Sequence, residues 1–185
     1  MMKHYDRQPV SNELEGKQAL SGALLDVFLG AGGSIASTVY GTIVVMATLT
    51  VGSASEPDPW KLAGLVAGAA LVLWIAHLYA HGLSESLVQR HRLRWAELVN
   101  IARRELGIVL AAVAPIATLL LGALGLIHED LAVWLALGIG FATLALEGVR
   151  YARLESLGRA GTLVAIALNL ALGSLVVALK VALAH

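Results

Sequence analysis

Residues 71–85 read LVLWIAHLYAHGLSE, and this stretch decides how the rest of the chain is interpreted. It continues an apolar run long enough to cross a bilayer, yet it carries His77, His81 and Glu85. Residues four positions apart on a helix lie on one face, so these side chains would stack over two turns. Ionisable groups are costly inside a membrane and usually face a partner, a water-filled path or an ion. The stretch therefore predicts a membrane helix with a functional face.

The composition indicates the same class of protein. The chain is 58% hydrophobic and 14% charged, and its mean hydropathy is +0.77. A soluble domain of 185 residues has too little interior to hide that much apolar surface. The formal net charge is zero, so no nucleic-acid partner is expected, and the lack of Cys excludes disulfides and thiolate ligands.

Five segments are apolar over about the 20 residues that a membrane span requires. They cover residues 35–52, 61–83, 106–127, 131–149 and 162–183. The expected fold is an all-α integral membrane protein in which residues 23–185 form a five-helix transmembrane domain. Residues 1–22 are polar, and we expect an amphipathic helix with its N-cap at Ser11 on the inner membrane surface, or alternatively a disordered tail. This segment is too long and too acidic to be the start of a cleaved signal peptide.

The connections between the spans predict their orientation. Residues 128–130 are too few for anything but a tight turn, so the third and fourth spans form an antiparallel hairpin. Residues 86–105 place apolar side chains at helical spacing among arginines, which predicts a helical linker that extends the second span or lies at the membrane surface. Eleven of the 13 Lys and Arg residues fall on one side of a five-span arrangement. That bias predicts a cytoplasmic N-terminus and an outside C-terminus, in a bacterial inner membrane.

The ionisable residues of the second span have two interpretations. His77, His81 and Glu85 suit a proton path or a first-row divalent metal, because neutral imidazoles and a carboxylate ligate such ions. Alternatively, the span ends near Tyr79, and His81 and Glu85 are only interfacial.

Tyr40 lies in the first span, within the sequence STVYGT (37–42). Small residues nearby, such as Ser37 and Gly41, allow another helix backbone to approach closely, so helix packing is one explanation of the motif. The other is that Tyr40 lines the path that the second-span histidines face. The candidate metal ligands are therefore His77, His81, Glu85 and Tyr40.

Two further polar features are assigned structural roles. Glu147 and Arg150 lie one turn apart near the inner end of the fourth span, which predicts an interfacial ion pair with Arg150 reaching toward water. Asn169 in the fifth span is expected to hydrogen-bond across helices.

The pattern of spans resembles the vacuolar iron transporter family. When Tyr40-Gly41 is laid on that family's Asp-Gly pair, His77 falls on the Met and His81 on the Glu of its Ser-Met-x-x-Gly-Glu-Tyr motif. Further similar positions are Ser84, Gln89, Arg90 and the Gly158 to Gly161 turn. The resemblance implies a homodimer with a pore between two copies of the first span, and a transported metal such as Fe²⁺ or Mn²⁺.

Together these features predict a membrane transporter or channel for a cation, either a divalent metal or a proton, with its path lined by the first two spans. No enzymatic motif is present, so we expect no enzyme and no cofactor. The alternative is an accessory or assembly subunit whose Gly- and Ala-rich helices pack against a partner. A membrane enzyme that acts on lipid through Glu85 or Glu147 is a third possibility.

Overall fold

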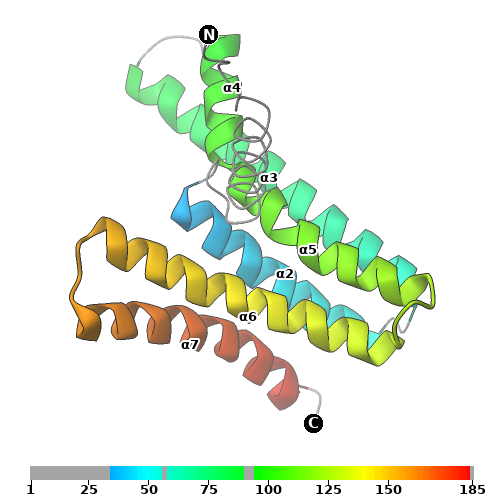
Figure 1. Cartoon of the computed structure of the whole chain (residues 1–185). Coiled ribbons are helices and arrows are strands. Elements are labelled where there is room, and N and C mark those ends of the chain that lie inside the picture. The colour runs from blue at the N-terminus through cyan, green and yellow to red at the C-terminus, as the bar shows by residue number, and fades with distance from the viewer. Residues whose placement is uncertain (1–33, 56–57, 90–93, 184–185) are drawn as a thin grey trace, which may run out of the picture.

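The computed structural model describes residues 34–55, 58–89 and 94–183, and within them it forms six helices and no strand (Figure 1). The helices are α2 (Ile35–Ser55), α3 (Pro59–Gln89), α4 (Trp95–Arg104), α5 (Leu106–Ala123), α6 (Glu129–Leu154) and α7 (Arg159–Leu183). The all-α prediction is confirmed for the described part of the chain. The helix expected over residues 1–22, with its N-cap at Ser11, lies outside the described residues, as does Arg90.

Five of these helices, all except α4, are long and apolar enough to cross a membrane. Each predicted span lies within one of them, except that the third was expected to reach residue 127. Instead α5 ends at Ala123, because Gly125 adopts a φ of 72°. The turn is closed by hydrogen bonds from the Gly125 N–H to the Gly122 carbonyl and from the Leu126 N–H to the Leu121 carbonyl. This is the usual glycine-terminated helix end.

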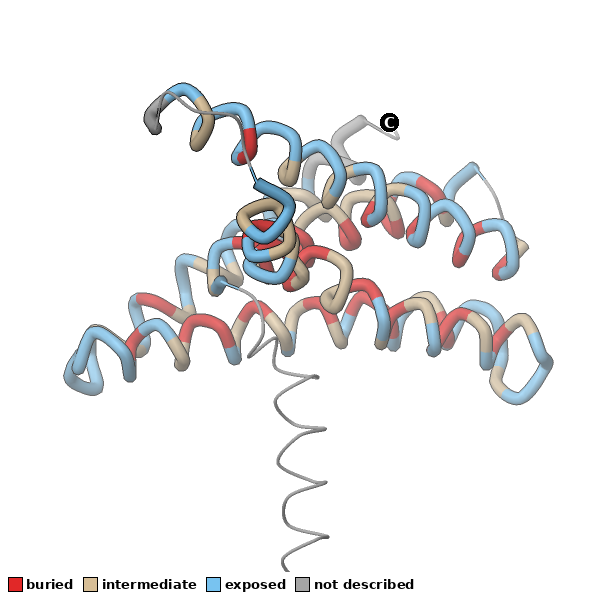
Figure 2. The backbone as a smooth tube through the Cα atoms, turned by 90° about the horizontal axis from the view of Figure 1, so that it is seen from above, coloured by how far each residue is buried: buried red, intermediate tan, exposed pale blue. Residues whose placement is uncertain are grey.

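The central helix of the bundle is α2, which contacts α3, α5, α6 and α7 (Figure 1). Buried residues lie on the inward sides of the helices, and the outer surfaces of the bundle are exposed (Figure 2). The largest buried side chains include Met46, Leu49, Leu62, Ile108, Leu119 and Leu144. Because lipid tails are as apolar as these side chains, close packing rather than exclusion from solvent must hold such helices together.

Glycines allow the helix backbones to approach one another. A Cβ atom on Gly41 of α2 would lie 2.6 Å from the Cα atom of Ile108 in α5. A Cβ atom on Gly148 of α6 would lie 2.8 Å from the Cα atom of Ile166 in α7. Any larger residue at these crossings would push the two helices apart.

The described residues of the predicted linker, 86–89 and 94–105, belong mainly to two helices, the end of α3 and the whole of α4. α3 has 31 residues, which makes it about 46 Å long, against about 30 Å for the hydrocarbon core of a bilayer. Its last turns therefore extend beyond a single membrane crossing. α4 packs beside this end of α3 and leads directly into α5 (Figure 1).

Candidate functional site

The two candidate histidines lie in the second half of α3, one turn apart. Their ring centroids are 6.0 Å apart. Nδ1 of His77 is 3.2 Å from the Leu73 carbonyl oxygen, one turn earlier in the same helix. A carbonyl only accepts, so this contact assigns the proton to Nδ1 and leaves Nε2 of a neutral ring as an acceptor. α3 continues without a break past Tyr79 to Gln89, so both histidines are within the helix.

Tyr40 of α2 lies beside His77 of α3. Its ring centroid is 4.9 Å from that of His77, with the rings tilted by 44°. The neighbouring Gly41 provides the close contact with Ile108 of α5. The two explanations of the STVYGT sequence are therefore compatible: the glycine packs the helices, and the adjacent tyrosine faces a histidine.

A glutamate from a third segment completes the group. Oε1 of Glu105 is 3.4 Å from Nδ1 of His81, slightly longer than the usual limit of about 3.2 Å for an N–H···O bond. The side chain of Glu105 is only 10% exposed, whereas that of His81 is 56% exposed. We call Tyr40, His77, His81 and Glu105 the polar row, which runs from an exposed tyrosine to a shielded carboxylate.

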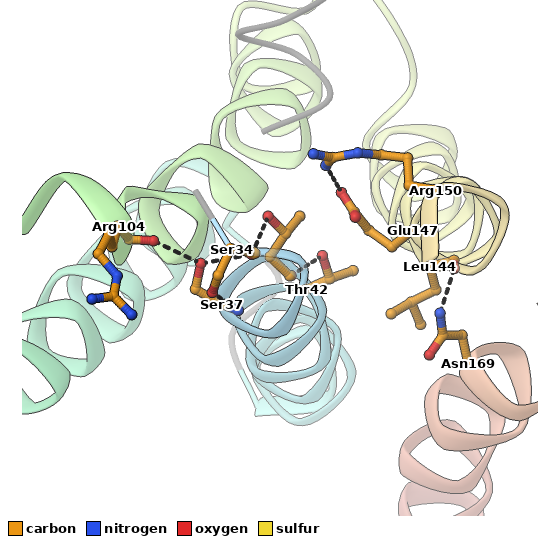
Figure 3. Close-up of polar contacts among 9 residues, drawn as sticks. Ser34, Ser37, Thr42, Arg104, Leu144, Glu147, Arg150 and Asn169 are labelled. Carbon is orange, nitrogen blue, oxygen red and sulfur yellow. Dashed lines mark hydrogen bonds and ion pairs between the residues drawn. The ribbon is translucent and has the colours of Figure 1, made fainter. Parts of the chain in front are cut away.

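Backbone hydrogen bonds hold Glu105 in place. It is the single residue between α4 and α5. The preceding carbonyl, that of Arg104, accepts hydrogen bonds from the N–H of Ser34, just before α2, at 3.0 Å and from the hydroxyl of Ser37 in α2 at 3.2 Å (Figure 3). From α3, the indole N–H of Trp74 donates to the Ala102 carbonyl at 3.2 Å. The turn that carries Glu105 is thus fixed by both helices that carry the rest of the polar row.

The absence of a side chain at Gly107 is needed for this arrangement. A Cβ atom there would lie 2.5 Å from the Ser37 hydroxyl oxygen and 2.6 Å from that of Thr38. Any larger side chain would separate the first turn of α5 from α2 and would strain the neighbouring bonds to Arg104.

The sequence pattern predicts no role for Glu105, the last residue of the predicted linker. The carboxylate beside His81 comes from the junction between α4 and α5, while Glu85 lies one turn further along α3 and is half-buried. The available signal was a lone acid directly before the apolar run of the third span. In an antiparallel bundle, the end of the second span and the start of the third lie at the same end.

The predicted metal ligands do not form a ready-made ligand set in one chain. Within the described residues, no three His, Asp or Glu side chains come close enough together to hold a metal ion. The assignment of His77, His81, Glu85 and Tyr40 as metal ligands therefore stays a prediction.

The ion pair predicted in the fourth span exists, but its position differs from the expected one. Nη1 of Arg150 is 2.7 Å from Oε1 of Glu147. The glutamate side chain is only 1% exposed, so it lies inside the bundle rather than at an interface. The predicted cross-helix hydrogen bond of Asn169 is present, since its side-chain amide donates to the Leu144 carbonyl at 3.1 Å (Figure 3).

By length and composition, five helices are able to cross a membrane, which defines a multi-pass integral membrane protein. No protein-family model matches the chain, and no curated protein or solved structure is significantly similar to it.

Proposed function

We propose that this protein is a membrane transporter or channel for a small cation, and that the polar row carries protons along part of its path. The observation that carries the proposal is the row of side-chain contacts from Tyr40 through the two histidines to the buried Glu105. Bringing this acid beside a histidine in an otherwise apolar bundle costs free energy, and such groups usually mark a functional path.

The chemistry of the row supports proton transfer more than metal binding. Imidazole takes up and releases a proton near neutral pH and does so through two different nitrogens. Within the described residues, no three-ligand group is available for a metal. Transport of Fe²⁺ or Mn²⁺ would therefore need ligands from a second copy of the chain.

The orientation that we propose places the polar row near the cytoplasm. The start of α2, the end of α3 and the start of α5 lie at one end of the bundle, together with the junction between α6 and α7 (Figure 1). That end carries Arg94, Arg103, Arg104, Arg150, Arg153 and Arg159. The excess of arginine favours a cytoplasmic location for it, in a bacterial inner membrane.

We further propose that the protein works as a homodimer or other homo-oligomer. In a single copy of the chain, Tyr40 is 44% exposed and the His81 side chain is 56% exposed. A second copy would shield these polar groups from lipid and would enclose the path.

The competing function is a non-transporting accessory subunit. One observation favours it: Gly64 and Gly68 lie one turn apart on an exposed face of α3, and a Cβ atom on either would meet nothing within 4 Å. Small residues spaced in this way are typical of helix–helix interfaces in membranes. In this case the polar row would be dispensable.

The test is ion flux in proteoliposomes that contain the full chain. We expect proton flux to fall by about a hundredfold or more in His81→Ala and in Glu105→Gln, the scale of losing one positioned acid or base. Matched controls are His128→Ala and Glu129→Gln, which alter exposed residues at the opposite end of the bundle. Uptake of Fe²⁺ and Mn²⁺ is measured in parallel. Normal flux in folded His81→Ala and Glu105→Gln would refute the role of the row, and no flux in any variant or in the wild type would favour the accessory subunit.

A further inference from the structure

Glu147 is a buried carboxylate that the polar row does not use. It lies on α6, on the other side of the central helix α2 from α3 (Figure 3). Oε1 is held by Arg150 at 2.7 Å, while Oε2 is buried and accepts no hydrogen bond from the described residues. A buried acceptor without a partner is unfavourable, so one that persists in a native fold calls for an explanation.

The level of Glu147 in the bundle is set by its helix. Gly140 of α6 lies against Met46 and Thr42 of α2. Glu147 is two turns further along the same face of α6, which runs antiparallel to α2, so it lies level with the first turns of α2. Figure 3 shows its side chain extending from α6 toward α2.

The two partners of the ion pair differ in their access to water. The Arg150 side chain is 27% exposed and that of Glu147 is 1% exposed. Because Arg150 is near the end of α6 and has a long flexible stem, its guanidinium can withdraw to the aqueous surface, whereas the carboxylate cannot follow. The carboxylate would then need another positive partner, since a lone buried charge is strongly unfavourable.

We propose that Glu147 is a second cation-binding station, at which a small metal cation that keeps most of its water shell displaces the guanidinium of Arg150. Arg150 thus serves as a tethered cation that neutralises the carboxylate when no metal cation is bound. A carboxylate oxygen is a hard ligand of the kind that such cations prefer. The inference rests on the proposed cation transport, to which it adds a site on the opposite side of α2 from the polar row.

The experiment is site-specific chemical labelling of the full chain in proteoliposomes. Dicyclohexylcarbodiimide modifies protonated carboxyl groups in apolar surroundings, and mass spectrometry of the digested protein reports labelling at each glutamate separately. Labelling is carried out at low pH, where a fraction of the carboxyl groups carries the proton that the reaction needs. A bound cation keeps the carboxylate deprotonated and so protects it. We expect either Na⁺ or Mn²⁺, each added separately, to suppress labelling of Glu147 in the wild type. The ion that suppresses labelling shows whether the site binds a monovalent or a divalent cation.

Removal of the tethered competitor should tighten cation binding. In Arg150→Gln the protecting concentration should fall by about ten- to a hundredfold, the equivalent of one charge-assisted hydrogen bond. If that variant does not fold, Arg150→Lys retains the charge without the planar fork and should shift the concentration in the same direction by a smaller factor. The control is Glu105, a second shielded carboxylate, whose labelling should be the same in the Arg150 variants as in the wild type.

Two outcomes overturn the inference: labelling of Glu147 that neither cation alters, or an Arg150 variant that protects no better than the wild type. Either would make the pair purely structural. The result is independent of the flux assay on His81 and Glu105. If His81→Ala and Glu105→Gln lose flux but no cation protects Glu147, only the second station is refuted. If a cation protects Glu147 but those two variants keep normal flux, only the role of the polar row is refuted.

Discussion

Replacing Gly41 by Ala should force α2 and α5 apart at a point of close backbone approach. The added Cβ atom would lie 2.6 Å from the Cα atom and 2.8 Å from the carbonyl oxygen of Ile108. Two carbon atoms in ordinary contact are about 3.5 Å apart, so the helices must separate by about 1 Å. Both clashing atoms belong to the backbone, and no side-chain rotation relieves them. Overpacking of this kind costs about 1–3 kcal/mol.

The prediction is checked by thermal unfolding in detergent. For a protein of this size, that cost corresponds to a Tm lower by about 2–12 °C. The matched controls are Gly64→Ala and Gly68→Ala, which make the same chemical change on α3, where an added Cβ atom meets nothing within 4 Å. They should unfold at or above the wild-type temperature, since Ala favours helix. Equal Tm values for Gly41→Ala and Gly64→Ala would refute the close α2–α5 crossing.

Three other substitutions test the turns and links that position the site. Ser156 ends α6 with a φ of 53°, so Ser156→Gly should stabilise the fold by about 1 kcal/mol, measured as a higher Tm. Asn169→Leu removes the hydrogen bond to the Leu144 carbonyl and should cost about 0.6 kcal/mol in the same assay; a stabilised variant would contradict the bond. Trp74→Phe removes the donor to the Ala102 carbonyl, so amide hydrogen exchange should accelerate in α4 and remain unchanged in α7.

The five apolar helices could be predicted because a membrane span is a local property. About 20 apolar residues are enough to define one, whatever its neighbours are. The main difference was the end of the third span, where an apolar sequence continued to residue 127 although the helix stops at Ala123. Hydropathy does not register the backbone conformation of Gly125, which ends the helix.

The candidate site was only half predictable. His77 and His81 could be paired from their spacing, since both belong to one helix. A site role for Tyr40 is one of two explanations of its motif. The contact of Tyr40 with His77 depends on how α2 packs beside α3. Glu105 was missed because its partner is 24 residues away on another helix. The sequence predicts an interfacial Glu147, since a position near the end of a span says nothing about which neighbours cover the side chain.

The sequence by itself determined that this protein is a bundle of apolar helices with ionisable residues along the second of them, because helix formation and membrane insertion depend on short contiguous stretches. Only the tertiary structure decided which acid meets which histidine, and which carboxylate is sealed inside the bundle. Those outcomes depend on the close crossings at Gly41, Gly107 and Gly148, where the lack of a side chain lets backbones from distant parts of the sequence come into contact.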